Sequence, residues 1–501
     1  MSAPAGASAG LEAPDEAAGL RRSAVRGAAS VVGSRVAMQI LAVAVTFVVA
    51  RILRPYDYGV ITTATIFLNL GDALASTGLA VALVQKPELT ERDMAEGFTL
   101  NLLLSLAVCS AIFVAAAPLA VYFELPDLKA ALCVSALALL LSPFRAVPMA
   151  LLERRMQFGR QSAVFTASAL VQSAVTLSAA YAGYGYWSLV ASFCVARAMD
   201  TAAFAYLAPW RPRLRMPGSS GGGLLKFVLH VTGSGLAWQV FSQADYAVAA
   251  KVVGPVELGY YALAFQLISL PTNRLAASFG QVAYTVFCRF QDRRDQVREW
   301  YLRLVALAGA IGLPVFVGMA LVAVDGVAVV LGPKWLPAAP FLRLLCAPGY
   351  VLFLTCTLHP VLNAFGRPDL PAKYNGAYAL FMPAAFLLAG RSHGLLGICT
   401  AWAVLYPAIT AALVHLTRPV LGFGVGELAR SQAPACAGAA AMAGAVLGVQ
   451  WCLPGADRAF LRLTLSIATG AAVYPAAVWV LARQTVVRDL RMMLQQLKGK
   501  P

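Results

Sequence analysis

The chain has 501 residues, of which 60% are hydrophobic and only 12% are charged. The apolar share lies well above that of an ordinary soluble domain, so the composition excludes a disordered chain, a collagen and a disulfide scaffold. At about 20 residues per span, the length provides for about a dozen or more transmembrane helices. The sequence therefore predicts a multi-pass membrane protein rather than a soluble catalytic domain on an anchor.

The formal net charge is +16, a value that also occurs in nucleic-acid-binding proteins. Here the Lys and Arg residues sit in short connections between apolar runs instead of forming one patch, so we expect no nucleic-acid partner. The nine Cys residues are scattered through apolar segments, with no CxxC pair and no His at metal spacing. We therefore expect neither a metal site nor a cofactor.

In chain order, residues 1–24 are rich in Ala, Gly and Pro and predict a disordered cytoplasmic tail without a cleavable signal peptide. Apolar runs between charged or Pro/Gly breaks then predict an all-α membrane protein with about 14 transmembrane helices. These spans lie near 26–50, 58–85, 95–121, 127–150, 161–183, 186–208, 225–250, 257–285, 300–324, 337–362, 374–391, 395–417, 432–453 and 459–482.

Every other connection between these spans is rich in Lys and Arg, whereas the opposite connections carry few basic residues. By the positive-inside rule both termini are cytoplasmic, as an even number of spans requires. Residues 484–501 place Leu, Met and Val at helical spacing with basic residues between them, which predicts a basic amphipathic tail on the inner leaflet.

The two halves of the chain repeat one pattern. The segment 50–59, ARILRPYDYG, aligns with 250–259, AKVVGPVELG, at a constant offset of 200 residues, and Gly33-Ser34 aligns with Gly233-Ser234. Because 200 residues hold an even number of spans, the copies should share one topology about an axis along the membrane normal. We expect two six-helix bundles, 25–208 and 225–418, a cytoplasmic linker at 209–224, and two additional transmembrane helices within 431–483.

Three stretches in the first half also resemble a known family: VVARILRPYDYGVITTATIFLNLGDALASTGLAVALVQKPELTERD, LLERRMQFGRQ and GYGYWSLVA. Their order and spacing are similar to the oligosaccharide flippase family of bacterial polysaccharide transporters. That family belongs to the multidrug/oligosaccharidyl-lipid/polysaccharide exporter superfamily. The resemblance implies two six-helix bundles around a central cavity, lined mainly by the first two helices of each half.

The function that this resemblance implies is translocation of an undecaprenyl-pyrophosphate-linked oligosaccharide across the bacterial inner membrane. Such a flippase would act by alternating access in exopolysaccharide, capsule or O-antigen biosynthesis. Its substrate would be the lipid-linked oligosaccharide, and its partners membrane lipids, glycosyltransferases and a polysaccharide polymerase. The Gly-rich linker lacks the Lys-Ser/Thr of a phosphate-binding loop, so we expect a transporter without nucleotide hydrolysis and no enzyme activity.

Charged residues inside predicted spans are costly and usually face protein or water. We assign Arg35 and Arg274 to the pyrophosphate because a guanidinium group presents paired donors to phosphate oxygens, with Arg145 as a third contact. Asp72 and Asp245 are candidate ion-coupling residues. The competing interpretation is that these two carboxylates neutralise the arginines and hold the halves together.

Sugar recognition usually combines aromatic faces with amides, and Trp238, Gln239 and Gln243 offer both on the seventh predicted span. Arg197 and Asp200 lie three residues apart on one span, a spacing that favours an ion pair within that helix. Trp187 and Trp335, near span ends, suit the membrane interface.

Two other functions remain open at this stage. One is a cation-coupled multidrug exporter of the same architecture, although its cavity should favour acidic residues over arginines. The other is a flippase for the peptidoglycan lipid precursor. A membrane glycosyltransferase or polymerase is disfavoured because no connection clearly exceeds about 20 residues.

Overall fold

The computed structural model describes residues 43–86, 89–216, 239–240, 242–289, 294–367, 369–455 and 458–497, and within these ranges it contains helices and no strand. The predictions for Arg35 and Trp238 lie outside the described residues, as does the second half of the linker, residues 217–224. The longer helices are Val43–Ile52, α2 (Pro55–Gln85), α3 (Glu91–Tyr122), α4 (Pro126–Leu137), α5 (Ser142–Arg154), α6 (Phe158–Tyr181), α7 (Trp187–Leu207), α9 (Ala244–Val252), α10 (Gly254–Arg289), α11 (Arg294–Leu321), α13 (Ala339–Ala364), α14 (Asp369–Leu421), α15 (Val425–Cys452) and α16 (Ala459–Leu497). Short turns at Ala138–Leu141, Ala323–Gly326 (α12), Val327–Leu331 and Pro333–Ala338 link some of them.

Helix ends follow the local sequence. Thr90 caps α3 through a reciprocal capping box with Asp93, and Pro126 occupies the first turn of α4. The stretch Asp369–Leu421 is continuous except at His393 and Gly394, where Gly394 takes a φ of 58°. The positive φ of Gly394 turns the chain between two predicted spans, so α14 consists of two helices joined at this residue. The predicted break at 391–395 is therefore observed.

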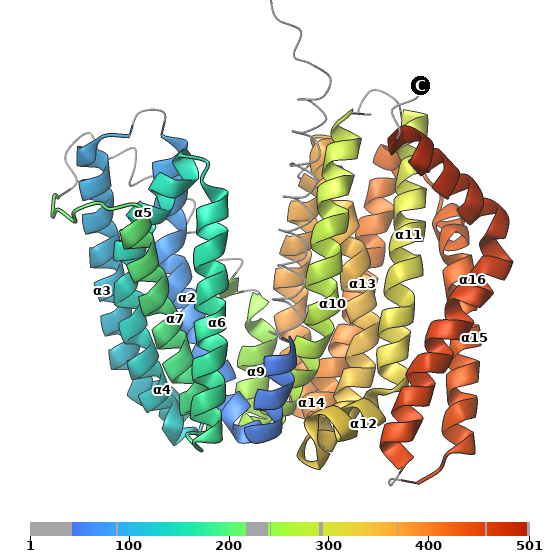
Figure 1. Ribbon diagram of the computed structural model, residues 1–501, viewed down its shortest axis with the longest axis horizontal. Helices are drawn as coiled ribbons and strands as arrows, with labels where there is room; N and C mark the ends of the chain where they lie inside the picture. The colour runs from blue at the N-terminus through green and yellow to red at the C-terminus, as the bar shows by residue number, and fades with distance from the viewer. Residues whose placement is uncertain are drawn as a thin grey trace, which may run out of the picture.

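The helices form two bundles and a peripheral pair (Figure 1). The N-terminal half consists of Val43–Ile52 and α2 to α7, and the C-terminal half of α9 to α14. In Figure 1 the two halves meet at the lower end, where α9 lies, and the helices diverge toward the upper end. We call the lower end the turn end, because the repeated turns before α2 and α10 lie there.

At the turn end the two halves contact each other reciprocally. A Cβ atom placed on Gly59 would lie 1.9 Å from the carbonyl oxygen of Pro255, and one on Gly259 would lie 1.9 Å from the carbonyl oxygen of Pro55. These four residues are equivalent at the offset of 200 residues. When residue i of one half contacts residue j of the other, and the equivalents of i and j make the same contact in reverse, the two halves are related by a two-fold axis. Here that axis lies within one chain. The structure therefore bears out the predicted pseudo-two-fold relation of the halves.

Cations at equivalent positions also cross between the halves. Arg51 donates from Nη2 to the carbonyl oxygen of Val329 at 2.9 Å, and Lys251 donates from Nζ to the carbonyl oxygen of Tyr122 at 2.7 Å. Lys251 also lies 3.2 Å from the carboxylate of Glu124. Each bond joins the outer turn of one half to the other half. Tyr122 is the last residue of α3, and Val329 lies in the short segment that follows α11 and α12. The turn end is thus closed by two similar sets of bonds.

A buried tryptophan adds to this closure. Trp335 is fully buried, and its indole Nε1 donates to the carbonyl oxygen of Ala50 at 2.7 Å. Its ring packs edge-on against Tyr58 of the N-terminal half and Tyr260 of the C-terminal half. The prediction that Trp335 anchors the membrane interface was wrong, because the ring fills the contact between the halves instead of facing lipid.

The C-terminal helices α15 and α16 are bonded to the C-terminal half along their length. Arg298 pairs with Glu427 at one end of α15, and Arg462 of α16 pairs with Asp325 of α12. Between these two ion pairs, Gln432 donates to the carbonyl oxygen of Val305 at 2.8 Å. These contacts attach the peripheral pair to α11 and its surroundings.

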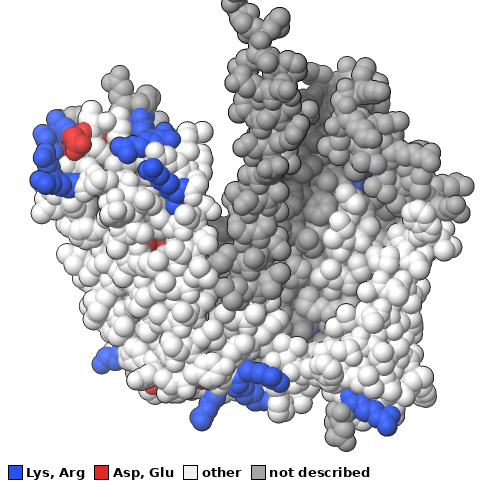
Figure 2. Space-filling view, viewed as in Figure 1, with Lys and Arg blue, Asp and Glu red and all other residues white. Residues whose placement is uncertain are grey.

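The surface is that of a membrane protein. Nine helical segments among the described residues are long and apolar enough to cross a bilayer, and α14, one of them, contains two of the predicted spans. Figure 2 shows Lys and Arg gathered at the two ends of the helices, with an almost uncharged band between them on the described surface. The predicted all-α membrane fold is confirmed, whereas the number of 14 spans stays a prediction.

Candidate functional site

A cavity of about 690 Å³ lies between the two halves. Its walls come from Val43–Ile52, α2, α6 and α7 on one side, and from α9, α10 and the residue before α9 on the other. A volume of this size falls within the range of pockets that hold small ligands. The first two helices of each half thus contribute to the walls, as the family resemblance implied, and α6 and α7 contribute as well.

The described lining mixes polar and apolar side chains and contains no charged one. Amide and hydroxyl groups alternate with apolar side chains, and the polar lining residues are Thr46, Thr62, Thr65, Gln172, Ser173, Thr176, Ser192, Gln243, Gln266 and Ser269. Tyr58, Phe193 and Tyr246 add aromatic rings. Such a surface offers hydrogen bonds to hydroxyl-rich ligands and flat faces to sugar rings, without a strong charge of either sign.

Among the residues predicted to bind sugar, Gln243 lines the cavity directly. It lies immediately before α9 and faces the ligand space together with Tyr246 and with Gln266 of α10. Gln239 belongs to the described residues but is not part of this lining. The role of Gln243 in substrate binding stays a prediction that its position supports.

The sequence analysis did not identify the contribution of α6. Gln172, Ser173 and Thr176 lie one to four residues apart and share a helix face with Ala169, and all four line the cavity. A polar stripe at helical spacing inside an otherwise apolar span indicates a face turned toward protein or water. That stripe was the signal that could have found these residues.

Four charged side chains form a cluster inside the N-terminal half. Arg197 of α7 lies 3.1 Å from the carboxylate of Asp72 on α2, and Arg145 of α5 lies 3.7 Å from the carboxylate of Asp200 on α7. All four side chains are largely shielded from solvent. The expected pair between Arg197 and Asp200 within α7 is therefore replaced by two pairs between helices. Both pairs lie within the N-terminal half. The competing interpretation expected Asp72 and Asp245 to neutralise the arginines and hold the two halves together. Among the described residues, Asp72 is the one of these two carboxylates that pairs with an arginine, and it does so within its own half.

This cluster borders the cavity without lining it. The guanidinium group of Arg197 lies 5.4 Å from the centre of the Phe193 ring, and Phe193 is a lining residue. Arg145 is not part of the described lining. The assignment of Arg145 to the pyrophosphate stays a prediction, as does that of Arg274, whose helix is described but whose side chain is not.

Asp245 occupies a different environment, in the core of the C-terminal half. It is 3% exposed, and its carboxylate accepts a hydrogen bond from the hydroxyl of Tyr261 at 2.6 Å and one from the backbone N–H of Tyr246 at 2.8 Å. Trp402 of α14 in turn donates to the Tyr261 hydroxyl at 2.9 Å. Since these bonds join α9, α10 and α14, Asp245 supports the helix that carries the lining residue Tyr246.

The described residues contain no group of three or more His, Cys, Asp or Glu side chains arranged to hold a metal ion. Asp72 and Asp245 lie in separate halves and have different partners. Asp72 and Asp245 therefore belong to two separate sites and not to one shared ion site.

Comparison with known proteins identifies the architecture. Over 90% of its length the chain superposes on an inward closed structure of the lipid II flippase MurJ, of which it covers 98%, with a TM-score of 0.71 at 12% sequence identity. It also covers 94% of an inward-facing multidrug resistance MATE family transporter, over 77% of its own length, with a TM-score of 0.59 at 14% identity. These two similarities establish a shared fold.

The curated relatives are similar over most of the chain. The lipopolysaccharide biosynthesis protein WzxC of Escherichia coli (strain K12) is 25% identical over 383 residues, covering 75% of this chain and 77% of that protein. The succinoglycan biosynthesis transport protein ExoT of Rhizobium meliloti (strain 1021) is 24% identical over 320 residues, covering 64% and 65%. The model of the polysaccharide biosynthesis protein family matches residues 48–340, which is more than half of the sequence, so the chain belongs to that family.

Proposed function

We propose that this protein is a flippase that carries undecaprenyl-pyrophosphate-linked oligosaccharide units across the bacterial inner membrane for exopolysaccharide, capsule or O-antigen biosynthesis. The observation that carries this proposal is the cavity between the halves, lined by amides and hydroxyls of both. A polar chamber inside an apolar band suits a sugar headgroup, while the isoprenoid tail stays in lipid.

The relatives support a transporter rather than an enzyme. They include proteins of lipopolysaccharide, teichuronic acid and succinoglycan biosynthesis, and one is named a transport protein. The shared fold includes a lipid II flippase. Polymerisation and glycosyl transfer would then belong to separate partner proteins, namely a polysaccharide polymerase and glycosyltransferases.

We further propose that the turn end faces the periplasm and that both termini are cytoplasmic. Figure 2 shows more Lys and Arg at the opposite end of the N-terminal half, as the positive-inside rule requires of a cytoplasmic surface. The connection between α5 and α6 lies at that end, with Arg154, Arg155 and Arg160 in and beside it. The bonds of Arg51 and Lys251 then close the periplasmic side. Alternating access requires that these bonds break when the chamber opens outward.

The proposed roles of single residues are as follows. Arg35 and Arg274 contact the pyrophosphate from the first and eighth spans, and Arg145 contributes from the cluster behind Phe193. Gln243 contacts the sugar, together with Trp238 and Gln239 from the same span. Asp72 and Asp245 are the candidates for ion coupling. The proposed domain limits are 25–208 and 225–418 for the two bundles, 209–224 for the linker and 431–483 for the peripheral pair.

The cavity can be tested in vesicles that contain the purified protein and a polyprenyl-pyrophosphate oligosaccharide. A membrane-impermeant glycosidase added outside reports how fast the sugar reaches the outer leaflet. The double variant Gln172→Leu/Gln243→Leu keeps the side-chain size and removes one amide from each half, so we expect at least a tenfold slower rate. Thr464→Val, on the exposed face of α16, is the control and should transport normally.

The same assay tests the arginines. Arg274→Ala should abolish transport while the protein remains in the membrane, whereas Arg274→Lys should retain part of the rate because the charge is kept. Transport at the wild-type rate by the double glutamine variant would refute the proposed chamber. Wild-type transport by Arg274→Ala and by Arg35→Ala would refute only the pyrophosphate assignment.

The alternatives make different predictions in this assay. A cation-coupled multidrug exporter would move a cationic dye and leave the sugar inside. A flippase for the peptidoglycan lipid precursor would transport that precursor in preference to the oligosaccharide.

A further inference from the structure

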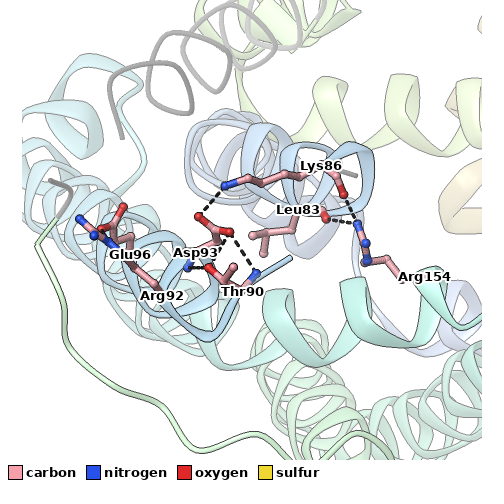
Figure 3. Close-up of polar contacts among 7 residues, drawn as sticks. All are labelled: Leu83, Lys86, Thr90, Arg92, Asp93, Glu96 and Arg154. Atoms are coloured by element: carbon pink, nitrogen blue, oxygen red, sulfur yellow. Dashed lines mark hydrogen bonds and ion pairs between the residues drawn. The ribbon is translucent and has the colours of Figure 1, made fainter. Parts of the chain in front are cut away.

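The first residues after α7 form an extended strap along the outside of the N-terminal half. We use the name linker strap for residues 209–216, which adopt no regular secondary structure. In Figure 3 the chain of this segment, in light green, passes around the outside of the helix that carries Arg92 and Glu96. The helix is α3, and the strap lies at the end opposite the turn end.

Two anchors hold the linker strap against α3. The indole Nε1 of Trp210 donates to the carboxylate of Glu91 at 3.2 Å, and its ring packs edge-on against Phe98. Five residues later, the backbone N–H of Arg215 donates to the hydroxyl of Thr99 at 2.8 Å. Because Glu91 and Thr99 are separated by about 12 Å along the helix axis, the strap runs along α3 and does not merely cross it.

These anchors set the depth of the strap in a bilayer. Helix α3 has 32 residues and is therefore about 48 Å long, against a hydrocarbon thickness of about 30 Å. With α3 centred in the bilayer, about 9 Å of helix extends beyond the hydrocarbon at each end. Thr99 then lies close to the hydrocarbon boundary and Glu91 beyond it, so the strap spans the layer of lipid headgroups.

The composition of the strap alternates. Arg211, Arg213 and Arg215 occupy every second position, and Leu214 and Met216 stand between or after them. In an extended chain, residues two apart share one side, so the three arginines form a row. Leu214 is 74% exposed and Met216 is 71% exposed, which in water would be unfavourable for such large apolar side chains. Leu214 and Met216 lie at the end of the strap near Thr99, which is the end closer to the hydrocarbon, so lipid can cover both side chains there.

The carboxylates in the first two turns of α3 are already engaged. Glu91 accepts the bond from Trp210. Figure 3 shows Asp93, which pairs with Lys86 and caps the start of α3, and Glu96, which pairs with Arg92 at 2.7 Å. In the part of the chain that the structure describes, none of the three strap guanidinium groups forms an ion pair. All three arginines are exposed.

We propose that the linker strap binds the phosphate groups of anionic phospholipids, with Arg211, Arg213 and Arg215 as the contacts and Leu214 and Met216 inserted between the acyl chains. The spacing of alternate residues, about 6.6 Å, presents a row of guanidinium forks at headgroup depth. Phospholipid binding would fix the start of the connection between the halves to the bilayer. This site is separate from the cavity and does not depend on the proposed substrate.

The test measures binding of a short-chain phosphatidylglycerol to the purified full-length protein in a zwitterionic detergent, with phosphatidylcholine as the neutral comparison. The triple variant R211Q/R213Q/R215Q removes three charges and leaves the anchor Trp210 in place. Since each basic residue near an anionic surface contributes about a fivefold factor, affinity for phosphatidylglycerol should fall about 100-fold. Added salt should weaken binding to the wild-type protein.

A variant with the same change in charge provides the control. R155Q/R391Q/R458Q also removes three exposed arginines, at positions scattered over both ends of the molecule, and should bind phosphatidylglycerol as the wild type does. Equal losses in the two variants, or wild-type binding by the strap variant, would overturn the proposal. Displacement of phosphatidylglycerol by excess inorganic pyrophosphate, but not by inorganic phosphate, would also overturn it and assign the strap to the pyrophosphate of a lipid-linked sugar. Unchanged thermal unfolding of the strap variant should accompany its loss of binding, because the three side chains are exposed.

Discussion

The reciprocal contact between Gly59 and Pro255 and between Gly259 and Pro55 yields a sharp prediction. Substitution of either glycine by alanine adds a Cβ atom 1.9 Å from a backbone carbonyl oxygen of the other half, whereas ordinary contact begins near 3.4 Å. The two halves must therefore separate by about 1.5 Å at the turn end. Overpacking of this kind costs about 1–3 kcal/mol, which corresponds to a change of about five- to 150-fold in the balance between closed and open turn ends.

The internal two-fold relation makes the prediction stricter. Gly59→Ala and Gly259→Ala should have similar effects, because each residue meets the equivalent proline. The double variant should have less than the sum of the two effects, since one displacement relieves both contacts. Gly376→Ala is the control: this helical glycine has open space around its Cβ position, and alanine there should be neutral or stabilising by up to about 1 kcal/mol.

The measurement uses spin labels on cysteines placed at Lys129 and Leu396, which are exposed at the turn end of the N-terminal and C-terminal halves respectively. The nine native cysteines are first replaced. Pulsed electron paramagnetic resonance should then detect a larger population at long distance in both glycine variants and an unchanged distribution in Gly376→Ala. A clear effect of one glycine variant without the other, or additive effects in the double variant, would refute the reciprocal contact.

Two further predictions concern pairs described above. Arg197→Gln should lower the free energy of unfolding in detergent by about 1–3 kcal/mol, because it removes the guanidinium group that lies 3.1 Å from the Asp72 carboxylate. Adding Asp72→Asn should restore part of the loss, and strictly additive losses would contradict the pairing. Trp335→Phe keeps an aromatic ring but removes the donor to the carbonyl oxygen of Ala50. The open turn end should become more favourable relative to the closed one by about 1–3 kcal/mol, which the spin-label distances would report as a larger population at long distance. An unchanged distance distribution would contradict the role of Trp335 in closing the turn end.

Much of the architecture follows from the sequence alone. Apolar runs predict most of the long helices, and the offset of 200 residues predicts the relation of the halves, since the same outer turn recurs before α2 and α10. The polar partners do not follow in this way. Arg197 and Asp200 are three residues apart, a spacing compatible with a pair on one helix, yet rotation of α7 in the bundle brings Arg197 to Asp72 and Asp200 to Arg145. Side-chain pairing across helices depends on that rotation, which hydropathy does not define.

The cavity illustrates the same limit. Gln243 was found because it lies on a span expected beside the chamber, whereas Gln172 lies on a helix for which no such expectation existed. The position of Trp335 near a span end predicts a place at the membrane interface, because its burial between the halves depends on how the two halves pack together. In each case the missing information was which helix faces meet.

The mutual contact at the turn end has an evolutionary consequence. An interface in which a segment meets its own equivalent needs only one gene, so a half-length ancestor could have formed it by pairing with a second copy of itself. Within one chain the covalent connection keeps the two copies paired and allows each to carry different side chains at equivalent positions. The arginine at position 51 and the lysine at position 251 are an example, because both reach across to the opposite half but bond to different partners there.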